Sequence, residues 1–355
     1  MSSTASAAAA RCIRSGTEKN INKALVGKGA IAVLCPNALF KLSNPVTFTA
    51  QNQELYTQGF PTGRTRATLR IVGSGTGAIY GDNISGLVLR SVQVDGNRPQ
   101  LGPETGQALI EVGGNAANQT IENVHAFDTR SWSTIHLFEG KVLKNGAPAC
   151  RKAKVLNNTF GPAGEPDGTW ADGISMACGI SLVANNVIRD ATDGAIVVFG
   201  APGTTVRNNT IIAATRQLLG GINMVDYAPV SGNYTDTVVT GNTIDAQGAF
   251  IKVGIGMGLG VWTCSTDVNY GGTVTNNTLE GDHFGYGFVA NGVKDWTVTG
   301  SKDLSVHDGV PASACGTTPS VPTGFEDENV TSSTLQPEFQ PASLDGVLNV
   351  SESPS

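Results

Sequence analysis

The sequence predicts an all-β protein built as a parallel β-helix, a solenoid of short strands, with a helix capping its N-terminal end. Three observations support this: a repeated Asn-containing motif, a repeat too short for other repeat folds, and a composition poor in charge. Of 355 residues, 45 are Gly and 15% are charged, whereas ordinary soluble domains have about 25% charged residues and about 7% Gly. This composition argues against helical bundles and coiled coils, which need Ala, Glu, Lys and Leu at helical periods.

Five segments repeat an apolar strand, a bend at Asn, and a second apolar strand. The Asn residues at the bends are separated by 28, 23, 33 and 35 residues. A propeller blade needs about 40 to 45 residues, but 23 residues can build one coil of a parallel β-helix. The Asn amides can stack as a hydrogen-bonded ladder, or serve only as turn residues that tolerate left-handed backbone. Either role favours a solenoid, with these residues at one bend: Asn158, Asn186, Asn209, Asn242 and Asn277.

The other elements follow in chain order. Residues 1–15 are expected to be a disordered or processed leader, since they lack the charged and apolar regions of an intact signal peptide. Residues 16–67 are expected to be the N-terminal cap, with a helix over 17–26 that ends at Gly27 and short strands after it. Such a helix would cover the open apolar end of the solenoid. Residues 68–315 are expected to form the β-helix, and 316–355, rich in Pro, Ser and acids, an extended tail.

Cysteine usage indicates a secreted protein. Six cysteines occur without a C-x-x-C pair, which disfavours zinc and fits disulfides. Pairing near neighbours joins Cys12 to Cys35, Cys150 to Cys178 and Cys264 to Cys315, while six buried thiols in a cytosolic protein are the alternative. Eight Asn-x-Ser/Thr triplets also favour secretion and glycosylation.

Charge and hydropathy limit the partners. Lys and Arg number 23 against 29 Asp and Glu, so no positively charged surface for nucleic acid is expected. No run of about 18 apolar residues occurs, so no membrane span is expected. The sequence leaves the oligomeric state open.

The order of these segments resembles the pectate-lyase-like, right-handed parallel β-helix superfamily. The resemblance rests on residues 21–25 and 30–48, on Leu69-Arg70-Ile71-Val72-Gly73 and on the Asn-Asn-Thr-Ile coils, and covers residues 17 to about 310. That superfamily includes polysaccharide lyases, glycoside hydrolases, epimerases and phage tailspikes, so the resemblance implies the fold and not one activity. The Asp-Asp, Gly-His-Gly and Arg-Ile-Lys segments of polygalacturonase-like hydrolases are absent from the sequence, as is the Arg-x-Pro-x-x-Arg pattern of one pectate lyase group. No catalytic residue is therefore carried over.

Two acids are expected at one position of neighbouring coils. Alignment of the coils on their Asn places Asp172 of Trp170-Ala171-Asp172-Gly173 beside Asp193 of Thr192-Asp193-Gly194. Stacked rungs would bring the carboxyls about 5 Å apart, a spacing that raises the pKa of one acid and that retaining glycosidases use. The same pair could hold a calcium ion, or each Asp-Gly could form only a bend. No other metal or cofactor is expected.

Further candidates flank this pair. His136 is expected to point outward beside Ser175 and to shuttle protons, although a surface His is ordinary. Arg130 could clamp a substrate carboxylate or pair with Asp128. These two residues join the acids as candidate catalytic groups. Flat rings for sugar stacking, nearby polar groups and a lysine expected to be solvated are the candidate substrate-binding residues: Trp132, Trp170, Tyr227, Asp226, Asn223 and Lys252.

The sequence thus predicts a secreted enzyme that cleaves glycosidic bonds of a polysaccharide or glycoside in a groove on the β-helix. A hydrolase is preferred to a lyase, because a lyase needs a cation or metal beside its base and only Arg130 is well placed. Two alternatives remain: a non-catalytic carbohydrate-binding surface protein, or an enzyme that isomerises or cyclises a small apolar substrate. The groove for the latter would be lined by residues that could equally form the core: Met176, Met224, Phe199, Phe250 and Trp262.

Overall fold

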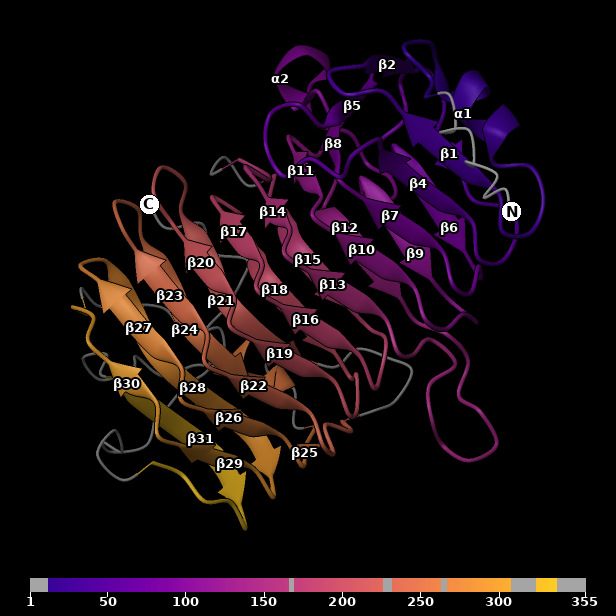
Figure 1. Cartoon of the computed structure of the whole chain (residues 1–355). Coiled ribbons are helices and arrows are strands. Elements are labelled where there is room, and N and C mark those ends of the chain that lie inside the picture. The colour runs from indigo at the N-terminus through magenta and orange to yellow at the C-terminus, as the bar shows by residue number, and fades with distance from the viewer. Residues whose placement is uncertain (1–11, 166–168, 226–231, 263–266, 308–323, 337–355) are drawn as a thin grey trace, which may run out of the picture.

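The computed structural model describes residues 12–165, 169–225, 232–262, 267–307 and 324–336. Within these residues, strands come in threes, one for each of three parallel sheets, and successive triplets stack along one axis (Figure 1). The chain is therefore a right-handed parallel β-helix, as the sequence predicts.

The three sheets run the length of the solenoid. The first sheet, before each Asn bend, contains β1 (Ile31–Leu34), β4 (Glu54–Thr57), β7 (Val88–Arg90), β10 (Thr120–Glu122), β13 (Lys154–Leu156), β16 (Leu182–Ala184), β19 (Thr205–Arg207), β22 (Val238–Thr240), β26 (Thr273–Thr275) and β29 (Thr297–Thr299). The second sheet, after the bend, contains β2 (Leu39–Leu42), β5 (Ala67–Ile71), β8 (Val92–Asp95), β11 (His125–Phe127), β14 (Thr159–Phe160), β17 (Val187–Arg189), β20 (Thr210–Ile212), β23 (Thr243–Ala246), β27 (Thr278–Gly281) and β30 (Lys302–Asp303). The third sheet contains β3 (Val46–Thr47), β6 (Ile79–Asp82), β9 (Ile110–Gly113), β12 (Ser133–Phe138), β15 (Asp172–Met176), β18 (Gly194–Phe199), β21 (Leu218–Val225), β24 (Ile251–Met257), β25 (Asn269–Tyr270), β28 (Phe284–Lys294) and β31 (Phe325–Thr331).

A ladder of buried Asn side chains joins the coils at the bend between the first and second sheets. Asn209 shows the pattern: its Nδ2 donates to Asn242 Oδ1 at 2.9 Å and to the Val183 carbonyl at 3.1 Å. Its Oδ1 accepts from the backbone N–H and from Nδ2 of Asn186, both at 2.9 Å. The same Asn-to-Asn bonds link the other ladder residues. Because each amide satisfies polar groups of the coils on both sides, the ladder fixes their register.

The residue before each ladder Asn has left-handed backbone. Its φ is 55° at Asn157, 57° at Asn185, 53° at Asn208 and 54° at Asn276, and Gly241 takes this position with φ 64°. Asn and Gly tolerate this conformation better than other residues. The two positions of the Asn-Asn motif therefore have separate causes, backbone conformation for the first and hydrogen bonding for the second.

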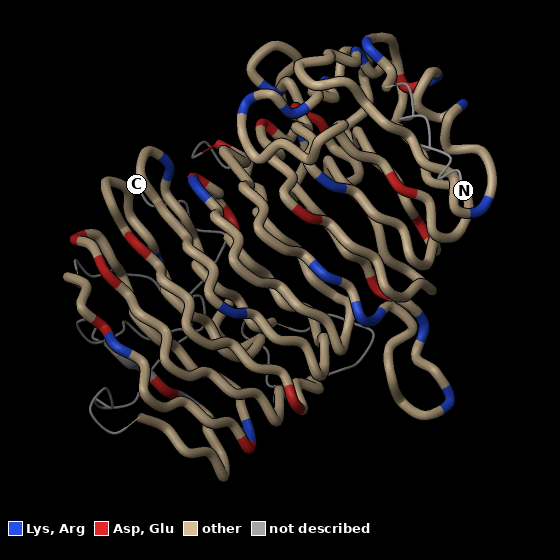
Figure 2. Tube along the Cα trace, viewed as in Figure 1, with Lys and Arg blue, Asp and Glu red and all other residues tan. Residues whose placement is uncertain are grey.

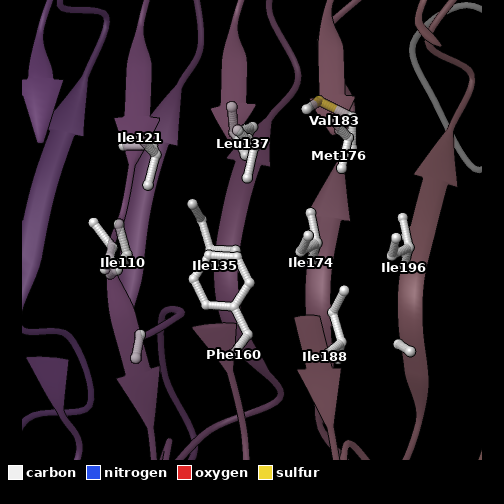
Figure 3. Packing of buried hydrophobic residues seen from close by; sticks show 14 of the residues in the cluster. Ile110, Ile121, Ile135, Leu137, Phe160, Ile174, Met176, Val183, Ile188 and Ile196 are labelled. Atoms are coloured by element: carbon white, nitrogen blue, oxygen red, sulfur yellow. The ribbon is translucent and has the colours of Figure 1, made fainter. Parts of the chain in front are cut away.

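Aliphatic side chains fill the space between the sheets. Ile110, Ile135, Ile174 and Ile196 lie in one row across neighbouring strands of the third sheet (Figure 3), directly paired in register and fully buried. Each contributes about 1.5 to 3 kcal/mol by leaving water. The repeat of one residue type along a row follows from the equal spacing of stacked coils.

Helix α1 (Glu18–Ala24) closes the N-terminal end, as predicted. Thr17 and Asn20 form its capping box, and Ile21 and Leu25 are buried against the core. The predicted boundary at residue 67 is wrong, because β1 to β4 already pair with the coils that follow. The predicted leader, residues 1–15, is also too long, because Ile13 already pairs with Leu34. Residues 1–11 lie outside the described residues, but backbone bridges join Ile13 and Gly16 to the first coil.

The β-helix also continues beyond the predicted boundary at residue 315. Strand β31 pairs with β28. Gln336, which is buried, accepts from the Ser301 N–H at 2.9 Å and donates to its carbonyl at 2.7 Å, while Ser301 Oγ accepts from the N–H of ladder residue Asn277. The prediction of an extended tail is therefore wrong for residues 324–336. These residues add to the β-helix although their composition is polar. Residues 308–323 and 337–355 lie outside the described residues.

Two of the three predicted disulfides are present, Cys12–Cys35 and Cys150–Cys178. The first joins the start of the described chain to the end of β1, and the second joins the segments that precede β13 and β16 on neighbouring coils. Cys264 and Cys315 lie outside the described residues. Disulfides of this kind fit an oxidising, extracellular environment.

Charged residues are sparse along the coils, and acidic and basic positions are intermixed (Figure 2). No helix in the described part of the chain is long and apolar enough to cross a membrane.

We expect Asn209→Ala to lower the free energy of unfolding by about 2 to 4 kcal/mol, because it leaves several buried partners without a hydrogen bond. Asn208→Gly is the matched control: Asn208 is exposed and left-handed, and Gly accepts this backbone, so the change should stay below about 1 kcal/mol. Urea denaturation of both variants measures the difference. Equal losses would mean that the second Asn is only a turn residue.

We expect the denatured, unreduced protein to show no free thiol on alkylation. A digest of that sample should contain the Cys12–Cys35 and Cys150–Cys178 cross-linked peptides, and a Cys264–Cys315 peptide if the remaining pair forms as the sequence predicts. Alkylation of Cys150 or Cys178 without prior reduction would contradict the assigned bridge.

Candidate active site

A pocket of about 590 Å³ opens where the chain leads into strands of the third sheet. Its walls come from segments just before β12, β15 and β18 and from the insertion between β8 and β9, which includes helix α2 (Arg98–Leu101). Four predicted residues, from three successive coils, line this pocket: Arg130, Trp132, Trp170 and Asp193. Arg98 and Glu104 also line it.

Asp193 lines the pocket and directly precedes β18. Its side chain is partly buried, and within the described residues no group donates a hydrogen bond to its carboxyl. Burial raises the pKa of Asp193 to about 6. The carboxyl can therefore exchange a proton close to neutral pH, as a general acid or base must.

Asp172 lies beneath the pocket and does not line it. Its side chain is only 4% exposed; its Oδ1 accepts from the Gly194 N–H at 2.8 Å, and its Oδ2 lies 2.7 Å from Ser175 Oγ. Burial, and then the negative charge of Asp193, raise the pKa of Asp172 well above its usual value. The expected interaction between the two acids is present, but the expectation that both face an open groove is wrong. Register explains this, since Ile174 pairs with Ile196 and the residue opposite Asp172 is Gly194.

A chain of hydroxyl groups leads from Asp172 into the sheet. Ser175 Oγ lies 2.8 Å from Ser133 Oγ, which lies 3.0 Å from the Ile135 carbonyl. With Asp172 protonated, each hydroxyl can donate to the next group until the last proton reaches that carbonyl. With Asp172 ionised, the two hydroxyl protons must serve three contacts, so one contact lacks a hydrogen bond. The chain is therefore complete when Asp172 holds a proton.

Arg130 does not serve the predicted role. Its guanidinium is 5% exposed and donates to the carbonyls of Gly102, Ser74 and Gly75 at 2.7 to 2.9 Å, so its donors bind the surrounding loops. No ion pair with Asp128 forms. Arg130 thus positions the pocket wall through its hydrogen bonds to these carbonyls.

His136 is held in an aromatic cluster behind the pocket. It pairs in register with Ser175 as predicted, and its ring lies 4.8 Å from that of Trp132 at an interplanar angle of 70°. Burial lowers the pKa of His136 to about 4. The residue is therefore neutral at physiological pH, so the predicted proton shuttle is not supported, and it supports Trp132 instead.

Of the remaining candidates, one lies beside the acids, one is buried, and two lie outside the described residues. Asn223 is buried next to Asp172: the position of a Cβ on Gly194 would lie 3.1 Å from Asn223 Nδ2 and 3.1 Å from Asp172 Oδ1. Lys252 is 1% exposed, so the prediction of a solvated, substrate-binding lysine is wrong. Tyr227 and Asp226 lie outside the described residues.

A second apolar cluster lies in the C-terminal half of the chain. It includes Val253, the residue after Lys252, together with Tyr286, Trp262 and residues of the 3₁₀ helix η1 (Leu259–Val261). The proposed apolar groove does not form either, because Met176 and Met224 lie in the inner core, fully buried.

Calcium at the acid pair stays a prediction of the sequence. Across the described ranges, no three His, Cys, Asp or Glu side chains are grouped so that they could hold an ion. Calcium needs about six to eight oxygen ligands, and a protonated Asp172 is a poor one. The sequence interpretation also missed Arg98 and Glu104. The signal was available: residues 96–109 are an insertion before a third-sheet strand, as is the segment that carries Trp170.

No protein-family model matches the sequence, and no curated protein matches it. Among solved structures the chain is similar to the endo-xylogalacturonan hydrolase of Aspergillus tubingensis, with 14% identity, a TM-score of 0.52 and 94% of each chain covered. It is also similar to the Family 28 exopolygalacturonase of Yersinia enterocolitica, with 16% identity, a TM-score of 0.50, and 85% of this chain and 47% of that chain covered. A tailspike protein of E. coli bacteriophage HK620, in complex with a pentasaccharide, has 12% identity and a TM-score of 0.50, with 88% of this chain and 61% of the tailspike covered.

At these identities the similarity shows the fold. The chain has the right-handed parallel β-helix fold that these structures share, as the order of its sequence segments predicts.

We expect Asp172→Asn to reduce the pH dependence of stability. An acid whose pKa is raised by folding stabilises the protein fully below its unfolded pKa, about 3.9, and loses this contribution as pH rises through the folded pKa. The Tm of the wild type should therefore fall between pH 5 and pH 8, and the fall should be smaller in the variant, whose amide can replace the protonated acid. Thermal melts over this range test it; an equal fall in both proteins would mean that Asp172 is ionised.

Proposed function

We propose that the protein is a secreted carbohydrate-active enzyme that hydrolyses glycosidic bonds in the pocket on the third sheet. The observation that supports this most is Asp193, a carboxyl with its pKa raised to about 6 in a pocket that Trp132 and Trp170 also line. Aromatic faces bind sugar rings by their apolar surface. The enzymes of this fold that act on polysaccharides, among them the xylogalacturonan hydrolase and the exopolygalacturonase, support the same substrate class.

In the proposed reaction, Asp193 donates its proton to the glycosidic oxygen as the bond from that oxygen to the anomeric carbon breaks. Water adds to the anomeric carbon, and its proton passes to a carboxylate acting as base. Glu104, the other carboxyl that lines the pocket, lies 3.9 Å from Arg130 Nη2 and is the candidate for this role. Two carboxyl groups with separate tasks are what glycoside hydrolysis requires.

The arginines favour hydrolysis over elimination. A lyase that acts on an acidic sugar needs a cation or metal to neutralise the substrate carboxylate beside its base. Arg130 donates to loop carbonyls, and Arg98 donates to the carbonyls of Thr129 and Arg130 and to Thr169. Because these donors hold the pocket wall together, they are poorly placed to bind substrate.

Asp193→Asn should lower kcat by about 100-fold or more with little change in substrate affinity, because it removes the proton donor and leaves the aromatic contacts. A polysaccharide panel, assayed for reducing ends and for the ultraviolet absorbance of unsaturated products, identifies the substrate and the reaction. Glu280→Gln, on the exposed face of β27, is the control. Unsaturated products would indicate a lyase, and binding without cleavage a carbohydrate-binding protein.

The kcat/KM of the wild type should fall tenfold per pH unit above about pH 6, because the acid must be protonated in the free enzyme. The descending limb of the pH profile measures this pKa. A profile that rises through pH 6 would assign Asp193 as a base.

A further inference from the structure

A second pocket, of about 520 Å³, lies on the outer face of the second sheet and shares no residue with the candidate active site. Gln93, His125 and Thr159 form its floor, from adjacent strands β8, β11 and β14 and in direct register. Arg64 and Arg66, from the segment that enters β5, form one wall.

Arg66 is a buried cation without a carboxylate. Its side chain is 8% exposed, its Nη2 donates to Asn123 Oδ1, and its Nε has no hydrogen-bond partner. Within the described residues no acid lies at ion-pair distance from it, whereas Arg70 lies 2.6 Å from Asp95. A buried charge that lacks a counter-ion is costly. An anion bound in the pocket would supply the missing partner.

The guanidinium is held in place before any ligand binds. Asn123, with left-handed backbone at φ 53°, accepts from Arg66 through Oδ1. Its Nδ2 donates to the Pro61 carbonyl at 2.9 Å and to Ser91 Oγ at 2.8 Å. The wall of the pocket and its charge are thus fixed by one amide, and such preorganisation lowers the entropic cost of binding.

The floor offers neutral hydrogen-bonding groups. Burial, and then the charge of Arg66, lower the pKa of His125, so the imidazole is neutral at physiological pH. Its Nδ1 lies 3.4 Å from Gln93 Oε1, whose Nε2 donates to Thr68 Oγ1. If His125 Nδ1 carries the proton and donates it to Gln93, His125 Nε2 is free to accept a hydrogen bond from a hydroxyl group. Arg64 adds an exposed guanidinium at the rim.

We propose that this pocket binds the carboxylate of an acidic saccharide unit, with the carboxylate on Arg66 and Arg64 and the sugar hydroxyls on His125 and Thr159. The anion is assigned from the unpaired guanidinium alone. The saccharide rests on the proposed function, since a glycan long enough to cross two faces of the solenoid would meet both sites. The second pocket would then hold an acidic polymer while the first one cleaves it.

Calorimetric titration of the whole protein with sodium glucuronate, sodium acetate and glucose tests this. We expect glucuronate to bind more tightly than acetate, and glucose to bind undetectably. Arg66→Gln and Arg64→Gln should each weaken glucuronate binding about tenfold or more, because hydrogen bonds to a charged group are lost. Arg207→Gln, an exposed arginine on the first sheet, is the control and should bind as the wild type does.

Arg64 is exposed, so Arg64→Gln keeps the test valid even where Arg66→Gln disturbs folding. Acetate binding as tightly as glucuronate would overturn the saccharide assignment, and glucuronate binding that both substitutions leave unchanged would overturn the site. Asp193→Asn separates the two sites: it should abolish cleavage and retain glucuronate binding at the second pocket. Glucuronate binding by a protein that cleaves no polysaccharide would contradict the proposed function and leave the second site standing.

Discussion

The in-register stacking of successive coils is the constraint on which the rest of the structure depends. Parallel pairing places equivalent residues about 4.8 Å apart, so each residue type must be favourable beside its own kind. Asn at the bend and Ile in the core both meet this condition, since an amide donates and accepts at once and aliphatic side chains pack in rows. Like charges repel at this distance, which accounts for a chain with only 15% charged residues.

Extra residues enter the coils away from the ladder. The bend and the strands on either side of it keep their length, although successive ladder residues are 23 to 35 positions apart. The additional residues lie before and after the strands of the third sheet, where they form α2, η1 and the segment that carries Trp170. The pocket is therefore lined in part by inserted segments, while the sheet beside it keeps its regular spacing.

Local patterns predicted the solenoid, the Asn ladder, the capping helix and two disulfides, because each depends on residues that repeat or lie close in sequence. The electrostatic interaction of Asp172 with Asp193 was also predictable from the coil alignment. Burial was not: Asp172 and Lys252 are 4% and 1% exposed, which neither the coil alignment nor strand alternation indicates. The donors of Arg130 bind carbonyls from loops more than 20 residues away, and no local pattern indicates such contacts. The site at Arg66 was not predictable from the sequence, because the burial of its guanidinium without a carboxylate partner depends on the folded structure.

Every solenoid with paired backbone groups has the same hazard at its ends, where a last strand can accept a strand from another molecule and grow into a fibre. At the N-terminal end, the backbone of Ile13 and Gly16 pairs with Leu34 and Phe40 of the first coil, and helix α1 contacts β1, β2 and β3. The chain thus fills the edge that a strand from a second copy would need there. Helix α1 and the segment before it therefore oppose end-to-end growth, besides covering the apolar core.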